Sequence, residues 1–177
     1  IICLYLIFNI LILCKLKYCK KTQCIMKIKF KWKLFSELTT DELYAIIHLR
    51  QKVFIVEQDC PYIDADYTDQ KAYHLLAFID GVLIGYLRAF KPGFKYLEAS
   101  IGRIIIASKY RKEGLGKKIT KRGISFLFKK FPRNNIVISA QYRLLDFYKN
   151  LGFIERGDVY LEDDIDHIEM CLECPKR

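Results

Sequence analysis

The sequence predicts a single mixed α/β domain. Segments with strand periodicity alternate with segments of helical periodicity, and no linker, repeat or low-complexity segment divides the chain. The chain has 177 residues, which fits one domain of ordinary size. Hydrophobic residues make up 52% of it and aromatic residues 14%, enough for a packed core. This composition excludes a disordered or collagen-like chain.

Each expected element follows from a local pattern. Residues 27–34 alternate apolar side chains with lysines, as a half-buried strand does. Thr39 and Glu42 form a capping box, and Asp80-Gly81 between two apolar runs predicts a tight hairpin. The predicted order is β-α-α-β-β-β-α-β-α-β-β, with strands at 27–34, 73–79, 82–90, 99–107, 135–140, 153–160 and 165–174. A first helix follows Thr39, and its inward stripe consists of Leu43, Ile46, Ile47 and Arg50. Further helices are expected at 51–57, 114–130 and 144–151, and a loop at 59–70.

The first 25 residues differ from the rest. Residues 1–14 are almost entirely apolar, but as a helix they would span only about 21 Å of a hydrocarbon core about 30 Å thick. Lysines follow this run, whereas a signal peptide carries its basic residues before it. We therefore expect translation to start at Met26, with 1–25 as upstream read-through and 26–177 as the domain. A short hydrophobic anchor is the alternative, and only then do we expect a membrane partner.

The charge leaves several anionic partners open. The formal net charge is +10, and without the four lysines of residues 1–25 it falls to about +6, because 26 basic residues then face 20 acidic ones. A basic domain can bind nucleic acid, an anionic membrane or an anionic cofactor. No base-reading motif occurs, so we expect no specific nucleic-acid partner.

The cysteines indicate a reducing compartment. Their number is odd and their spacing scattered, unlike a disulfide framework, so we expect a cytoplasmic protein. Cys171 and Cys174 form a single CxxC without a second pair of ligands, and we expect no metal site.

A glycine-containing turn carries the clearest chemical signal. The pattern Arg111-x-x-Gly114-x-Gly116 lies between a buried strand and an amphipathic helix. Amides in the first turn of a helix lack intrahelical partners, the helix dipole favours an anion there, and glycine lets the backbone approach a phosphate. The pattern is neither a P-loop nor a dinucleotide fingerprint. It predicts a diphosphate site, although a plain turn before a basic, solvated helix face also fits these residues.

Two motifs together resemble the GNAT superfamily of N-acetyltransferases. The strand, the RxxGxG turn and the helix are similar to its acetyl-CoA motif, and residues 144–153 (LLDFYKNLGF) are similar to its second signature. Residues 50–62, 101–103 and 140–141 resemble the ElaA-like branch. The resemblance covers residues 26 to about 174 and implies an α/β fold with a mixed sheet whose central parallel strands splay apart.

The resemblance also implies where acetyl-CoA binds as co-substrate. CoA would lie in a V between residues 101–107 and 136–140, with its pantetheine arm along the backbone of 104–106 and its pyrophosphate at the amides of 112–117. The implied cofactor-binding residues are Ile104, Ile105, Ile106, Arg111, Lys112, Glu113, Gly114, Leu115, Gly116 and Lys117.

Two catalytic residues are expected. Tyr148 matches the family's tyrosine near the sulfur, where a phenol can protonate the leaving thiolate, although it could also be a core aromatic. An amine that attacks the thioester must lose a proton, and Glu57 is our candidate base, with a cap or ion-pair role as the alternative. Candidate substrate contacts are His74, Arg103, Gln141 and His167. A histidine at a strand end is more often structural, and Gln141 stands where much of the superfamily has asparagine.

The acceptor is expected to be a small-molecule or peptide amine. Acidic residues gather in the loop 59–70 and the turn 162–166, and they would favour a cationic amine if both flank the acceptor groove. They would otherwise be solvated surface. Two further functions stay open: a CoA-binding regulatory module without turnover, and a basic protein that binds membrane or nucleic-acid surfaces. The sequence does not specify an oligomeric state.

Overall fold

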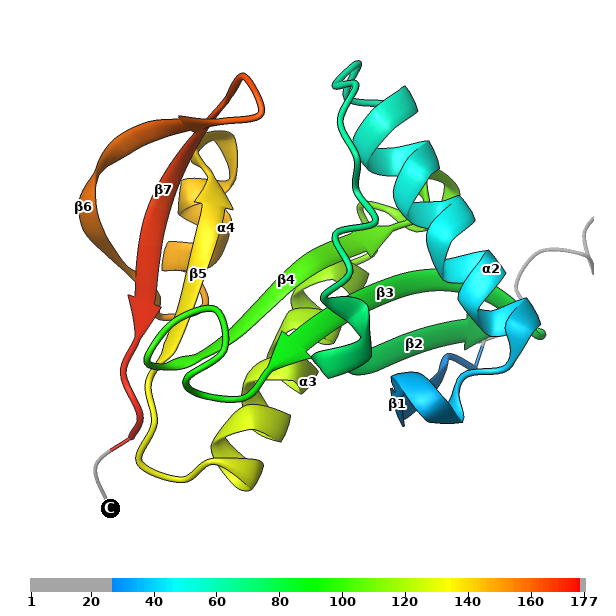
Figure 1. Ribbon diagram of the computed structural model, residues 1–177, viewed down its shortest axis with the longest axis horizontal. Helices are drawn as coiled ribbons and strands as arrows, with labels where there is room; N and C mark the ends of the chain where they lie inside the picture. Colours follow the sequence, from blue (N-terminus) through cyan, green and yellow to red (C-terminus); the bar gives the residue numbers. More distant parts are fainter. Residues whose placement is uncertain (1–26, 176–177) are drawn as a thin grey trace, which may run out of the picture.

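The structure, a computed structural model, describes residues 27–175, so the predictions for residues 1–25 and Met26 lie outside it. A seven-stranded sheet with the order β1-β2-β3-β4-β5-β7-β6 runs through this part of the chain (Figure 1). Its strands are β1 (Lys29–Leu34), β2 (Tyr73–Ile79), β3 (Val82–Phe90), β4 (Ala99–Ile106), β5 (Ile136–Gln141), β6 (Ile154–Glu162) and β7 (Ile165–Leu172). Its helices are α2 (Thr40–Arg50), α3 (Leu115–Lys130) and α4 (Leu145–Lys149). The mixed sheet and the element order confirm the predicted fold.

The N-terminal elements follow their sequence patterns closely. Trp32 stacks on Phe126 of α3 with ring centroids 3.8 Å apart, which holds the half-buried face of β1 against that helix. Leu34 is 44% exposed, so its predicted place on the buried face is wrong, because the chain turns there into the short helix η1 (Phe35–Glu37). The capping box of Thr39 and Glu42 is confirmed, with both hydrogen bonds at 3.1 Å.

The second predicted helix is an extension of the first. α2 runs without a break into the π-helical segment η2 (Gln51–Val56), which ends where the amide of Glu57 donates to the carbonyl of Lys52 at 3.0 Å. The inward stripe of α2 also differs from the prediction. Ile46, Leu49 and Arg50 are buried, whereas Leu43 and Ile47 are only half-buried.

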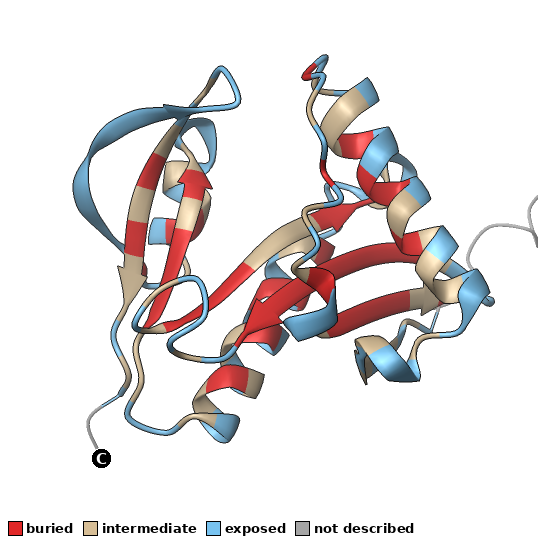
Figure 2. Ribbon diagram, viewed as in Figure 1, coloured by how far each residue is buried: buried red, intermediate tan, exposed pale blue. Residues whose placement is uncertain are grey.

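Helices cover both faces of the N-terminal half of the sheet (Figure 1). Because successive strand residues point to opposite faces, Leu75 and Leu87 pack on the α3 side, while Leu76 and Tyr86 pack on the α2 side. Burial is concentrated in β2, β3, β4 and β5, and β6 is exposed along its length (Figure 2). None of the helices within residues 27–175 is long and apolar enough to cross a membrane.

The two central parallel strands separate soon after they meet. β4 and β5 pair only at Ala99 with Ile136 and at Ser100 with Val137. Beyond this point the β3–β4 register shifts, and Arg103 adopts a left-handed backbone with φ of 50°. β5 pairs with β7 along its whole length instead. The sheet is therefore split into two halves that diverge like a V (Figure 1).

Candidate active site

The split in the sheet opens into a cleft of about 1080 Å³. Both diverging strands line it, together with η2, the turn before α3, and α4. β4 has no strand partner on this side after Ser100, so its main-chain polar groups border the cleft. Such an unpaired strand edge can bind an extended ligand as an added strand.

The turn before α3 presents free amides to this cleft. Lys112 and Gly114 adopt left-handed conformations, with φ of 68° and 73°, which shape the entry into the helix. Within residues 27–175, no backbone acceptor pairs with the amides of 112–117, whereas the amide of Lys118 donates to Gly114 at 3.1 Å. The turn residues that line the cleft are Arg111, Lys112, Gly114, Leu115, Gly116 and Lys117, and Glu113 is not among them. The free amides of this turn, the dipole of α3 and the lysines beside them together suit a phosphate-bearing ligand.

Glu57 is engaged in an ion pair. Its Oε2 lies 2.6 Å from Nη2 of Arg111, and Nε of Arg111 donates to the carbonyl of Ile106 at 2.9 Å. Arg111 therefore ties η2 to the end of β4. This arrangement matches the ion-pair alternative for Glu57, although the residue also lines the cleft.

Tyr148 is buried and lines the same cleft. Its side chain is 8% exposed, and its ring packs edge-to-face on Phe147 and Phe153 with centroids 5.1 and 5.8 Å away. Burial raises the pKa of its phenol to about 12. The hydroxyl therefore keeps its proton at neutral pH and can only donate to a negatively charged neighbour.

A largely buried ionic network supports the wall of the cleft beside β3 and β4, and its members Arg88 and Arg103 line the cleft. Arg50, Arg88 and Arg103 pair with three aspartates of the loop between η2 and β2. The bonds are Arg50 Nε to Asp64 Oδ2 at 2.6 Å, Arg50 Nη1 to Asp69 Oδ2 at 2.8 Å, Arg88 Nη2 to Asp66 Oδ2 at 2.7 Å, Arg88 Nη1 to Asp69 Oδ1 at 2.8 Å, and Arg103 Nε to Asp64 Oδ1 at 2.6 Å.

This network corrects the prediction that the loop offers its acids to a cationic amine. Three loop aspartates are neutralised by arginines instead of facing the groove. Burial opposes the ionisation of Asp69, but the charges and hydrogen bonds of Arg50 and Arg88 outweigh it and hold its pKa below the ordinary value. Arg103, a candidate substrate contact, lines the cleft and forms an ion pair with Asp64.

His74 is a structural residue of the same region, which corrects its placement as a substrate contact. It is 1% exposed and does not line the cleft. Its Nδ1 lies 2.7 Å from the Tyr86 hydroxyl and its Nε2 lies 3.0 Å from the Asp69 carbonyl. Both ring nitrogens are therefore occupied inside the protein.

The opposite wall is polar and comes from β5, β6 and β7. Gln141 and Tyr160 both pair with His167, so strand alternation places these three side chains on one face. The Tyr160 hydroxyl donates to Ser139 Oγ at 2.6 Å, and Ser139 Oγ donates to Glu162 at 2.7 Å. Ser139, Gln141, Glu162 and His167 line the cleft.

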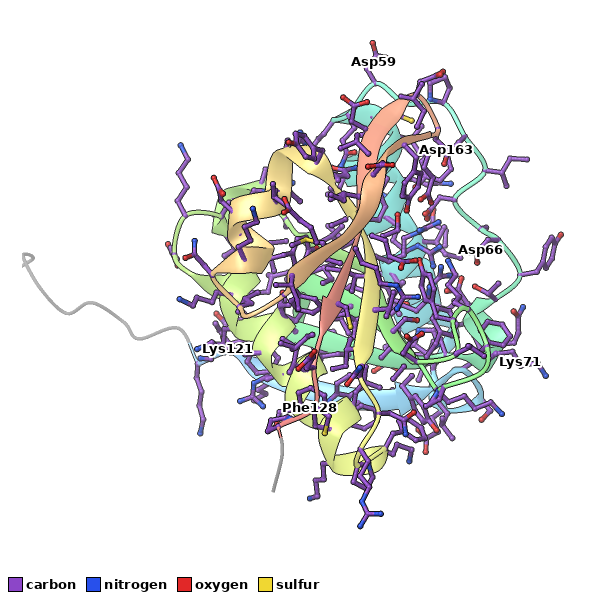
Figure 3. All side chains as sticks on the ribbon, turned by 90° about the vertical axis from the view of Figure 1, so that its left-hand side faces the viewer. Asp59, Asp66, Lys71, Lys121, Phe128 and Asp163 are labelled. Atoms are coloured by element: carbon purple, nitrogen blue, oxygen red, sulfur yellow. The ribbon has the colours of Figure 1, made fainter. Side chains whose placement is uncertain are left out.

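Two hydrogen bonds cross between the walls. Gln141 Nε2 donates to Gln58 at 2.8 Å, and Cys60 Sγ donates to the carbonyl of Asp163 at 3.2 Å. Figure 3 shows Asp163 and Asp59 at the same end of the molecule, where this second contact lies. These contacts hold the walls together beyond the split in the sheet.

His167 is the predicted histidine that faces the cleft. Its Nδ1 lies 2.8 Å from the carbonyl of Ile165, and a carbonyl can only accept, so Nδ1 carries the proton. In this tautomer Nε2 carries no proton and is an acceptor. The ring also stacks on Tyr160 with centroids 6.2 Å apart, which fixes its orientation.

Some residues that line the cleft were not predicted from the sequence. Lys95 and Tyr96 reach the cleft because their loop folds back onto β3, a tertiary effect without a local signal. Ser139 was detectable, since it alternates with buried Ile138 and Ala140. Within residues 27–175, no cluster of three or more His, Cys, Asp or Glu side chains is placed to hold a metal ion.

Comparisons with known proteins agree with this geometry. Residues 46–174 match the model of the acetyltransferase (GNAT) domain family. Protein ElaA of Escherichia coli is 36% identical over 140 residues, which cover 78% of this chain and 92% of that protein. A UPF0039 protein of Synechocystis sp. is 36% identical over 151 residues, covering 85% and 98%.

Solved structures show the same fold. The crystal structure of an acyl-CoA N-acyltransferase from Pseudomonas aeruginosa aligns with a TM-score of 0.79 at 37% identity, covering 82% of this chain and 99% of that one. The crystal structure of Escherichia coli ElaA aligns with a TM-score of 0.78 at 34% identity, covering 83% and 100%.

The ionic network predicts a pH-dependent stability. Asp69→Asn leaves two buried guanidinium groups without a full counter-charge, so we expect the free energy of unfolding at pH 7 to fall by about 3–5 kcal/mol. The folded-state pKa of Asp69 lies below its unfolded value, so the stability that its carboxylate contributes is present above about pH 4 and is lost as the pH falls.

Urea unfolding of Asp69→Asn and of the unaltered protein, from pH 7 downward, measures this difference in the free energy of unfolding. The difference should shrink on acidification, while Asp59→Asn, an exposed change in the same loop, should have little effect. Equal unfolding free energies for Asp69→Asn and the unaltered protein would contradict the network's role.

Proposed function

Because this chain belongs to the GNAT acetyltransferase family, we propose that it transfers an acetyl group from acetyl-CoA to a primary amine, by direct attack in a ternary complex. One observation carries the proposal. The turn with unpaired amides, the open edge of β4 and the phenol of Tyr148 all border a single cleft. A binding module needs the first two features, and only an acyltransferase uses the third.

The cofactor side of the cleft is built from main-chain groups. The amides of 112–117 bind the pyrophosphate, and Lys112 and Lys117 add positive charge beside it. The edge of β4 at Ile104–Ile106 receives the pantetheine arm, although the Ile106 carbonyl already accepts a hydrogen bond from Arg111. The thioester then lies where the two strands separate.

Tyr148 assists departure of the thiolate. A phenol with a pKa of about 12 is a weaker acid than a thiol, whose ordinary pKa is about 8.5. Full proton transfer to a free thiolate would therefore cost about 5 kcal/mol at that value. Hydrogen-bond donation to the charge that develops on sulfur has no such cost, and this donation is the role we assign to Tyr148.

His167 replaces Glu57 as the base in this proposal. The carboxylate of Glu57 is held by Arg111 at the cofactor side, while Nε2 of His167 is an acceptor on the polar wall. A neutral imidazole can take the proton that the amine loses on attack. The Gln141 amide donates a hydrogen bond to Gln58, and we assign it the role of positioning the polar wall.

Binding of acetyl-CoA should stabilise the protein through the turn at Gly114. At 100 times its dissociation constant the ligand should add about 2.7 kcal/mol, roughly 5–10 °C in melting temperature. Gly114→Glu places a charged side chain at the phosphate site and should abolish this shift. Gly114→Ala is the matched control, because both variants strain a backbone with φ of 73°. If Gly114→Glu keeps the full shift, the turn is not part of the binding site.

Loss of the Tyr148 hydroxyl should slow chemistry without weakening cofactor binding. We expect Tyr148→Phe to lower kcat by about 10²–10³-fold, since one donor to a developing charge is removed, and to leave the acetyl-CoA thermal shift intact. Thiol release in the presence of an accepted amine measures the rate. Tyr142→Phe, an exposed change near α4, should retain full activity. Full activity of Tyr148→Phe would contradict the role that we assign to the phenol.

The choice of base is tested by paired variants. His167→Gln cannot take a proton, so kcat/KM for the amine should fall by about 10²–10⁴-fold with acetyl-CoA binding retained. Added imidazole should partly restore turnover to His167→Ala. Glu57→Gln should weaken acetyl-CoA binding more than it slows the bound complex. The opposite pattern, with His167→Gln active and Glu57→Gln inactive in the bound complex, would return the role to Glu57.

A further inference from the structure

The loop between β3 and β4 carries an unpaired cation into the cleft. Gly93, with φ of 77°, donates to the carbonyl of Tyr96 at 2.8 Å and folds the loop back. Phe94 stacks on Phe90 with ring centroids 5.0 Å apart. Nζ of Lys95 then lies 5.9 Å from the centroid of the Phe90 ring. Lys95 therefore lines the cleft, although the residue as a whole is exposed.

On this wall the positive charge of Lys95 is not balanced by an acidic side chain. The three arginines of the network face three aspartates, so that network is neutral. Within residues 27–175, Lys95 takes part in no ion pair. Partial desolvation and the charges of Arg88 and Arg103 lower the pKa of its ammonium, and the charges of Asp66 and Glu162 oppose this shift. An anionic ligand would relieve that repulsion.

Arg103 offers a second donor group on the same side. Its Nε is used by Asp64, and its guanidinium lies over Phe54 and Tyr62 at 5.7 and 5.9 Å. The side chain is 20% exposed and lines the cleft, and its Nη2 is 3.8 Å from Asp66, beyond hydrogen-bond distance. A planar guanidinium fixed in this way suits a carboxylate.

Ser100 and Gly102 also line the cleft and leave open, polar space in it. Gly102 faces empty space where a Cβ would lie. Within the described chain the Ser100 hydroxyl has no hydrogen-bond partner, although the residue is only 3% exposed. Glu162, on the opposite wall, supplies a negative charge that Ser139 orients. The cleft therefore has the cation of Lys95 on one wall and the anion of Glu162 on the other.

We propose that the acceptor is a primary amine that also carries a carboxylate, and that Lys95 and Arg103 bind this carboxylate while the amine faces Glu162 and His167. This inference rests on the proposed amine acetylation and names its substrate class. It replaces the cationic amine that the sequence suggested.

Matched acceptors test this assignment. Thiol release from acetyl-CoA is measured with glycine, β-alanine, γ-aminobutyrate and amino acids of each side-chain class, each beside its amide and its decarboxylated amine. The carboxylate-bearing member should have a kcat/KM at least about tenfold higher, equivalent to about 1.4 kcal/mol. Lys95→Met should remove this preference by raising KM for that member and should leave the amide unchanged. Lys91→Met, which removes an exposed lysine that does not line the cleft, should alter neither.

Two outcomes would overturn the inference while amine acetylation stands. One is an amide or a diamine that matches the carboxylate-bearing member. The other is an equal effect of Lys95→Met on both members of a pair, since a damaged fold moves both.

Failure of the proposed function has a different signature, in which acetyl-CoA stabilises the protein but no amine speeds thiol release. The anion site is then tested by calorimetry, with N-acetylglycine and N-acetylglycine amide titrated into the CoA-saturated protein. Tighter binding of the carboxylate form, lost in Lys95→Met, supports the site. Equal binding, or none, overturns it.

Discussion

The pairing of β4 with β5 stops after Ser100, and the whole site depends on that stop. Up to Ser100 the two strands share main-chain hydrogen bonds, and beyond it the edge of β4 borders a cleft. The left-handed backbone of Arg103 and the register shift beside it bend β4 away from β5. The same bend directs the end of β4 into the turn that begins α3. A continuous sheet would leave no edge for an extended ligand and no space for a thioester.

The bend is maintained by buried charges. A non-glycine residue in a left-handed conformation costs of order 1–3 kcal/mol unless its surroundings hold it. Arg103 is held by Asp64, and Asp64 is also bound to Arg50 of α2. The acids of the η2–β2 loop thus stabilise the strand geometry. Lys95 and Glu162 line the cleft from opposite walls and are the charges that we assign to substrate binding.

Local patterns predicted the turn before α3 and the cap of α2 well. Gly114 and the capping box at Thr39 act through nearby backbone geometry, which the sequence determines directly. Side-chain roles that depend on distant partners were harder to predict. His74 looked available because nothing near it in sequence shows that Tyr86 and Asp69 occupy its ring. The position of Lys95 in the cleft could not be predicted because it depends on a loop that folds back over Phe90. Glu57 was ambiguous for the same reason, since Arg111 lies far from it in the chain.

The central claim is that acetyl-CoA binds along the free edge of β4 and at the free amides of 112–117. Amide hydrogen exchange with and without saturating acetyl-CoA tests it most directly. The account predicts slower exchange in peptides that cover 104–106 and 112–117, and unchanged exchange in β1 and β2, which lie at the far edge of the sheet. Saturating acetyl-CoA that leaves 112–117 unprotected, or that protects only residues outside the cleft, would contradict the account.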